Sequence, residues 1–352
     1  MKKSYIYIGI LFLLATGCKK ESKFTTFKKF PETIKLTGKE TRLKPNFKVA
    51  YLDLYENKLI IHLTTHNDKL VHIYNKKSLN HIISIAKKGR GPNEIKKPGS
   101  TVIENNGKIL INDWGRHYLI GYHIDSLIKG KNQTHKIIGK TPVAVFPSFN
   151  FSQIYDSLFL YTTHNPGYYF YCANKKGKII DSLNIKNKTN IYPNLNRNNI
   201  LFTTWYHYAI HPSEKKIILA YMYTDIIVGI DFKGNILFQC QGPDVFQEEP
   251  TAKNLMSKDV QIAFESVKAD EKYIYCKYNG KSKLVNKENN EITANYGESL
   301  LVYNWEGKPI LRIDLDHPFL DFVIDRNNKK IITYTSDLGQ IFTYKLPELL
   351  WE

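Results

Sequence analysis

The sequence predicts an all-β fold in which six small sheets form a ring, the six-bladed β-propeller. A short apolar unit, which begins with lysine in five of its six copies, recurs at intervals of 49 to 59 residues. The copies are Lys58–Ile61, Lys108–Ile111, Ser157–Leu160, Lys216–Leu219, Lys272–Tyr275 and Lys330–Thr333. Such a period is typical of radial or solenoid folds, and short strands between turn residues favour a propeller with one four-stranded blade per roughly 40–50 residues.

Each copy of the unit lies within a group of strands that forms one expected blade. The expected strands are 48–54, 58–63, 70–74 and 81–86 in blade 1; 101–103, 108–112, 119–123 and 136–138 in blade 2; 149–154, 158–162, 168–173 and 179–183 in blade 3; 207–211, 216–221, 226–231 and 236–240 in blade 4; 261–268, 273–277, 300–304 and 310–313 in blade 5; and 319–325, 330–334 and 340–345 in blade 6. Blade 6 lacks one strand. Because a propeller avoids exposed sheet edges by pairing its chain ends, we expect the N-terminal strand Thr33–Leu36 to complete this last blade and close the ring.

The hairpins between third and fourth strands share a turn in three blades. The segments Asn174–Lys178, Asp231–Asn235 and Asn304–Lys308 all carry glycine as their fourth residue. Glycine adopts a positive φ without steric cost, so this agreement supports the strand assignment. Blade 5 also carries a polar, Asn-rich insertion, Lys281–Glu298, which we expect to be a mobile loop.

Residues 1–17 are expected to be a signal peptide. Lys2 and Lys3 precede the apolar stretch Tyr5–Leu14, which is shorter than the about 20 residues that a membrane span needs. The following Ala15–Cys18 resembles a bacterial lipobox, with Ala15 where leucine is usual; the alternative is an ordinary secretory signal with an incidental cysteine. We expect a lipidated Cys18, a tether over 18–32 and the propeller over 33–352. The protein would then be an outer-membrane lipoprotein of the cell envelope, facing the periplasm or the exterior.

Composition argues against several classes of site and partner. The other cysteines, Cys172, Cys240 and Cys276, are odd in number and lie in apolar strands, so we expect small buried hydrophobic side chains. No CxxC or HExxH motif indicates zinc. The net charge of +17 could attract nucleic acid, anionic glycans or acidic lipids, but the lysines are scattered and no basic run exceeds two residues. We therefore expect no nucleic-acid partner.

The connection between blades 1 and 2, Ala86–Ile95, carries a recognisable pattern. It contains Gly89, Arg90, Gly91, Pro92 and Glu94, and it resembles the G-x-G-P-x-E loop of six-bladed, TolB-like propeller lipoproteins of the Bacteroidota. The resemblance covers nearly the whole mature chain, and it implies fold and location more than activity, because function in that family is mostly unassigned. We expect the glycines and Pro92 to shape the crossing between blades, and Glu94 to pair with Arg90 or cap nearby amides.

Candidate binding residues lie in the hairpins between second and third strands. Propellers bind ligands on the face where these hairpins gather, and the tendency of tight turns toward Asn, Asp and Gly does not explain the aromatic, His and Arg residues found there. The residues that we expect on this rim are His66, Asp113, Trp114, Arg116 and His164.

Two functions follow from this pattern. The first is a non-catalytic binding module that contacts a glycan or protein ligand on the rim, anchored to the membrane by its lipid, without a cofactor. The alternative is a metal-dependent hydrolase or lyase with a divalent cation such as calcium at the central channel, for which Asp53, Asp113, Asp225 and Asp325 are candidate oxygen donors. No G-x-S-x-G motif supports a serine hydrolase, and no paired acids with defined spacing indicate catalytic residues.

Overall fold

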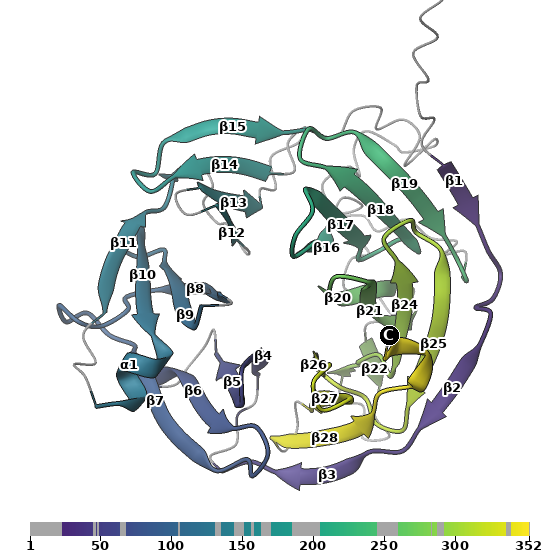
Figure 1. The fold of residues 1–352 in the computed structure, drawn as a ribbon, viewed down its shortest axis with the longest axis horizontal. Coiled ribbons are helices and arrows are strands. Elements are labelled where there is room, and N and C mark those ends of the chain that lie inside the picture. The colour runs from purple at the N-terminus through teal and green to yellow at the C-terminus, as the bar shows by residue number, and fades with distance from the viewer. Residues whose placement is uncertain are drawn as a thin grey trace, which may run out of the picture.

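Six sheets of four or five strands, mainly antiparallel, stand around a common centre in the computed structural model (Figure 1). The structure describes residues 23–44, 47, 49–63, 68–104, 106–130, 135–143, 151–155, 158–162, 170–184, 205–244, 260–282, 284–286, 292–335 and 339–351. This arrangement confirms the predicted all-β, six-bladed propeller.

Within each blade the strands follow one another from the centre of the ring to its outer edge (Figure 1). Their bounds are β4 (Tyr51–Tyr55), β5 (Lys58–His62), β6 (Lys69–Asn75) and β7 (His81–Lys87) in blade 1; β8 (Pro98–Ile103), β9 (Lys108–Asp113), β10 (Tyr118–His123) and β11 (Lys136–Lys140) in blade 2; β12 (Phe151–Tyr155), β13 (Leu158–Thr162), β14 (Phe170–Asn174) and β15 (Ile179–Leu183) in blade 3; β16 (Tyr206–Ile210), β17 (Lys216–Tyr221), β18 (Ile226–Asp231) and β19 (Ile236–Gln241) in blade 4; β20 (Gln261–Ala269), β21 (Tyr273–Ser282), β24 (Ser299–Asn304) and β25 (Pro309–Leu315) in blade 5; and β26 (Asp321–Asp325), β27 (Lys330–Tyr334) and β28 (Gln340–Lys345) in blade 6.

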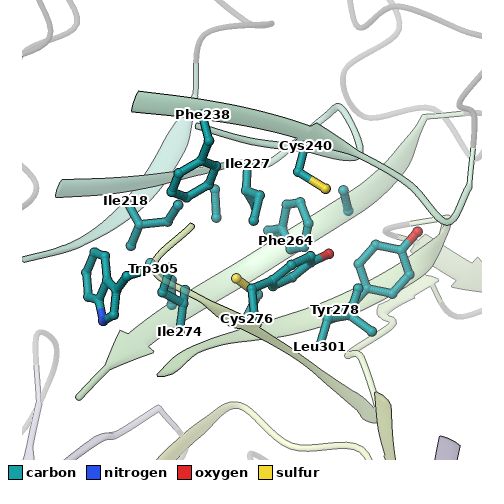
Figure 2. Close-up of a cluster of buried hydrophobic side chains, with 14 of the residues drawn as sticks. Ile218, Ile227, Phe238, Cys240, Phe264, Ile274, Cys276, Tyr278, Leu301 and Trp305 are labelled. Carbon is teal, nitrogen blue, oxygen red and sulfur yellow. The ribbon is translucent and has the colours of Figure 1, made fainter. Parts of the chain in front are cut away.

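The repeated apolar unit of the sequence is the second strand of each blade. This strand has a neighbour on both sides and a further blade over each face, so most of its apolar residues are buried; all five residues of β5 are buried. Neighbouring blades share their cores, as Figure 2 shows for Ile218, Ile227 and Phe238 of blade 4 against Phe264 of blade 5. The ring is therefore held together by apolar packing between sheets.

Three N-terminal strands run along the outside of the ring (Figure 1). β1 (Lys23–Thr26) pairs parallel with β19, β2 (Thr33–Leu36) pairs parallel with β25, and β3 (Lys39–Arg42) pairs antiparallel with β28. The prediction that Thr33–Leu36 is the fourth strand of blade 6 was therefore wrong, because β3 takes that position and Thr33–Leu36 is a fifth strand of blade 5. β1 also forms within the segment that we expected to be a tether.

The shared glycine turn is present in blades 3, 4 and 5. Gly177, Gly234 and Gly307 have φ angles of 76°, 78° and 77°, as the sequence predicted. In each turn the side-chain oxygen of the first residue accepts hydrogen bonds from the backbone N–H groups of the residues two and four positions later. These first residues are Asn174, Asp231 and Asn304. The turn is thus fixed by an Asn or Asp side chain together with the glycine backbone.

The insertion in blade 5 contains more regular structure than predicted. β21 extends to Ser282, and β22 (Leu284–Asn286) and β23 (Ile292–Ala294) pair with each other as a small antiparallel sheet. A short helix, α1 (Ile124–Ile128), links β10 to the segment before β11. Within the described residues no helix is long and apolar enough to cross a membrane.

All three described cysteines are free, as expected. Cys240 and Cys276 are buried in the core between blades 4 and 5 (Figure 2), whereas Cys172 is half-buried. Burial raises the pKa of the Cys240 thiol to about 11, so this side chain is a neutral hydrophobic group at physiological pH.

Candidate functional site

The predicted binding residues of blade 2 lie together on one face of the ring. We call this face the rim face. It is the face at which the innermost strand of each blade begins and the second strand ends, as the pairing of Pro98 with Asp113 shows for blade 2. Trp114 and Arg116 follow Asp113 in the hairpin between β9 and β10. The other predicted residues lie outside the described residues: Cys18, His66 and His164.

Asp113 is fully buried and binds backbone amides. Its carboxylate accepts the N–H groups of Lys96 and Lys97 at 3.1 and 3.0 Å and that of Gly115 at 3.0 Å. A buried carboxylate is stable only when such donors replace the water that it has lost. Asp113 therefore fixes the chain where it enters blade 2 and is not available to a ligand.

Arg116 holds the connection between blades 1 and 2. Its guanidinium donates to the backbone carbonyl oxygens of Glu94, Arg90 and Gly91, the last two at 2.9 and 2.8 Å. It also lies 3.5 Å from the Asp113 carboxylate. The planar fork of five donors suits this task, because one side chain reaches three carbonyl groups. Arg116 is thus the centre of the loop's hydrogen bonding.

Glu94 binds the backbone and a lysine of the same connection and so fixes its conformation. One carboxylate oxygen accepts the Gly91 N–H at 2.8 Å, which confirms the expected capping, and the other is 2.8 Å from Lys87 Nζ. Of the two roles expected for Glu94, the structure shows the capping of an amide, and its ion-pair partner is Lys87 in place of Arg90. Lys87 and the Gly91 amide together lower the pKa of Glu94. A Cβ atom at Gly89 would lie 2.0 Å from this carboxylate, so a side chain there would displace the Glu94 carboxylate from its present position.

The outer surface of the loop is exposed and basic. Arg90, Pro92 and Asn93 are exposed, and Lys96 and Lys97 beside them are exposed as well. Trp114 is half-buried, and its indole lies against Gly99, where a Cβ atom would be 2.6 Å from the indole nitrogen. The loop and this hairpin therefore form one surface, built from a rigid base and exposed cationic and polar side chains.

A second group of charged and titratable residues, which the sequence did not reveal as a group, lies on the two innermost strands of its blades. We call it the inner charge cluster, and its members are Asp53, His62, His207, Glu265, Lys268, Lys277 and Asp321. They come from blades 1, 4, 5 and 6. Because these residues are up to 268 positions apart and follow no motif spacing, only the closed ring brings them together.

Lys268 joins three blades within this cluster. Its Nζ donates to the carbonyl oxygen of Leu52 in blade 1 at 2.8 Å and lies 3.5 Å from Asp321 of blade 6 and 3.7 Å from Asp53. Asp321 in turn accepts the N–H of Leu52 at 2.8 Å. Burial opposes the charge on Lys268, but Asp321 and Asp53 outweigh it and raise the pKa of Lys268 above its ordinary value. The lysine is therefore charged and pairs with both acids.

Asp53 and His62 form the adjoining pair in blade 1. His62 Nε2 is 3.0 Å from the Asp53 carboxylate, and the imidazole stacks against the ring of Tyr51 with 5.5 Å between centroids. Burial alone would raise the pKa of Asp53, but Lys268 and His62 lower it below the ordinary value. Asp53 is therefore an ionised, paired carboxylate.

Glu265 and Lys277 form the second ion pair, within blade 5. Their charged groups are 2.7 Å apart, and Lys277 is almost fully buried and also donates to the Leu320 carbonyl oxygen at 3.2 Å. Glu265 further accepts the Asn279 side-chain amide at 2.9 Å and the Gly297 N–H at 3.0 Å. Burial lowers the pKa of Lys277, which Glu265 partly offsets. Both groups are saturated by protein partners.

His207 of β16 is the neutral member of the cluster. Burial lowers its pKa to about 4; Glu265 and Asp321 oppose this shift by smaller amounts, and Lys277 adds to it. Its Nε2 has no hydrogen-bond partner among the residues that the structure describes. An uncharged imidazole here avoids a further buried charge beside Lys277.

The four aspartates considered as metal ligands lie in different blades and have other partners. Asp53 pairs with His62, Asp113 binds amides, Asp225 accepts the Asp244 N–H at 2.5 Å, and Asp325 is 2.8 Å from Lys76 Nζ. Burial raises the pKa of Asp225 well above its ordinary value. Over the described ranges, no three His, Cys, Asp or Glu side chains are grouped to hold a metal ion.

The sequence matches the TolB-like 6-blade propeller-like family over residues 26–327, and the chain belongs to this family. Among solved structures it is similar to a protein of Bacteroides fragilis described as exported, with 13% identity, a TM-score of 0.52 and coverage of 93% of this chain and 99% of the other. A member of the DUF4221 family from Bacteroides vulgatus is 12% identical, with a TM-score of 0.57 and coverage of 88% and 97%. No curated protein matches the sequence. At these identities the likeness to solved structures shows the fold.

The role of Arg116 can be tested by substitution. We expect Arg116→Ala to lower the free energy of unfolding by about 2–3 kcal/mol, because three carbonyl groups and the buried Asp113 lose a charged donor. Arg116→Lys should recover little, since one ammonium group cannot reach all three carbonyls. Urea unfolding measures both, with Arg90→Ala as the control because its side chain is exposed. An Arg116→Ala protein as stable as Arg90→Ala would contradict this role.

His207 should make stability depend on pH. The pKa of His207 is about 4 in the folded protein, against an ordinary value of 6.5. The neutral imidazole therefore contributes its full stabilisation of the fold above about pH 6.5, and this stabilisation is lost as the pH falls toward 4. Between about pH 7.5 and about pH 5 we expect wild type to lose about 2 kcal/mol more unfolding free energy than His207→Gln. Urea midpoints at both pH values test this, with the exposed His123→Gln as control. Equal losses in His207→Gln and wild type would refute it.

Proposed function

We propose that this TolB-like propeller is a lipoprotein of the cell envelope that acts as a non-catalytic binding module. Cys18 would hold it at the outer membrane, and the rim face would contact a glycan or protein ligand. The lipobox-like segment Ala15–Cys18 supports the anchor. Export is further supported by the similar fold of the Bacteroides fragilis protein that is described as exported.

The observation that carries the non-catalytic part is the pairing inside the inner charge cluster. A catalytic acid or base must reach a proton of its substrate, directly or through one water molecule. Lys268 and Lys277 instead bond to carboxylates and backbone carbonyls within the protein, and the carboxylates take the complementary bonds. These charges thus stabilise the scaffold on which the surface loops stand.

The binding surface that we propose is the loop Lys88–Ile95 together with the hairpin that follows β9. Arg90, Asn93 and Trp114 are the residues that we expect to contact the ligand, whereas Asp113 and Arg116 position the loop beneath them. A tryptophan beside exposed polar groups suits stacking against a sugar or peptide. The exposed cations on this surface favour a ligand with acidic groups, which they would attract over a distance set by the ionic strength.

This proposal is tested by capturing ligands from the solubilised envelope with the full-length protein. We expect Arg90→Glu and Trp114→Ala each to reduce the captured ligand by about tenfold, equivalent to about 1.4 kcal/mol, without loss of stability. Lys176→Glu is the matched control, because this exposed lysine lies in the turn between β14 and β15, away from the rim face. Ligand capture that is unchanged in both rim variants would refute a rim-face site.

A further inference from the structure

The N-terminal segment 23–42, which we call the strap, is fastened along the outside of blades 4, 5 and 6 (Figure 1). Between β1 and β2, Phe27 donates its backbone N–H to the Gln241 carbonyl oxygen at 3.0 Å. Phe30 is buried and packs edge-on against Tyr303, with 5.4 Å between ring centroids. The strap is therefore part of the folded domain and has a fixed position on its side wall.

The outward side of the strap is basic. In β2, Ile34 and Leu36 pack onto the core of blades 5 and 6, while Lys35 is exposed. Lys28, Lys29 and Lys39 are exposed as well, and none of the four lysines forms an ion pair with a described carboxylate. Over the whole strap, six basic residues stand against two acidic ones, Glu32 and Glu40, and Glu40 pairs with Arg42 at 3.1 Å.

The chain between the proposed anchor and the strap is short. Only five residue steps separate Cys18 from Lys23, the first residue of β1, so the two lie at most about 18 Å apart. If Cys18 carries the lipid, the outer edge of blade 4 is held near the bilayer. The outer strands of blades 1, 2 and 3, with exposed Ile82, Ile137 and Ile180, carry no part of the strap (Figure 1).

We propose that the strap is a membrane-docking surface: the side wall of blades 4–6 lies against anionic lipid headgroups, and the rim face is turned sideways. The inference rests on the proposed lipid anchor and adds the orientation of the domain. A lysine near an anionic bilayer contributes about 1 kcal/mol, and the attraction is confined to about one Debye length, so only cations already held close to the surface take part. The four exposed strap lysines meet that condition, whereas lysines on the outer strands of the blades without the strap do not.

The test is amine acetylation of the mature, lipidated protein in vesicles that contain about 30% phosphatidylglycerol, read by mass spectrometry. Relative to the protein in nonionic detergent, we expect Lys28, Lys29, Lys35 and Lys39 to react at least about threefold more slowly. Lysines on other surfaces, such as Lys176 of blade 3, should be unchanged. High salt should restore the reactivity of the strap lysines, because the attraction is screened.

A matched pair of variants isolates the charge of the strap. Lys28→Gln combined with Lys29→Gln and Lys35→Gln should return Lys39 to its reactivity in detergent, because three of the four exposed strap lysines are then gone and the remaining attraction is too weak to hold the wall to the lipid. The control removes three lysines from the turn of blade 3 and should leave Lys39 protected; its substitutions are Lys175→Gln, Lys176→Gln and Lys178→Gln.

The outcomes separate the orientation from the anchor. If the protein floats with vesicles and Cys18→Ala does not, but the strap lysines stay reactive, the docking surface is wrong and the proposed anchor stands. Protection of Lys96 and Lys97 instead would mean that the rim face lies on the membrane, which also overturns the proposal. If Cys18→Ala floats as well as wild type, the lipid anchor fails and the orientation fails with it.

Discussion

The closed ring depends on the contact between its last blade and its first. Apolar packing joins each blade to the next, and at this junction the chain also passes from β3 of blade 6 into β4 of blade 1, so the pairing of β3 with β28 closes the ring. There, Asp321 accepts the N–H of Leu52, and Lys268 donates to the carbonyl oxygen of the same residue from blade 5. The backbone of Leu52 in blade 1 is thus bonded to two other blades. The opposite charges of Asp321 and Lys268, which make these bonds, compensate each other.

This arrangement divides the molecule into a fixed centre and a variable surface. The ion pairs of the inner charge cluster are bonded inside the protein, which leaves ligand recognition to loops on the rim face. The loop Lys88–Ile95 is rigid because Arg116 and Glu94 bind its backbone from below, so its exposed residues are presented without a large loss of entropy on binding. Members of a propeller family can therefore keep one scaffold while changing what their surface residues bind.

Local signals in the sequence predicted local structure well. The second strands were recognisable because burial on both sides makes them continuous apolar runs, and the glycine turns because a positive φ restricts the residue type. The pairing of the N-terminal strands was not predictable, since Thr33–Leu36 is a short alternating segment, Lys39–Arg42 is short and entirely polar, and tertiary contacts decide which strand each one pairs with. The inner charge cluster was missed because Lys268, Asp321 and Asp53 carry no motif; the packing of blade 5 on blade 6 and the closure of the ring onto blade 1 make them neighbours. The close approach of Gly89 to the Glu94 carboxylate is likewise a contact that the sequence pattern did not show.

The most direct test of the junction is the unfolding free energy of Lys268→Met, alone and combined with Asp53→Asn and Asp321→Asn. Removing the lysine alone leaves Asp321 without its cation and Asp53 with His62 as its remaining partner, so the single variant should lose at least about 2 kcal/mol. Neutralising both acids as well should recover most of that loss, because no unpaired charge remains. A single variant within about 0.5 kcal/mol of wild type would show that the blades close without this ion-pair network, and would contradict its place at the centre of the structure.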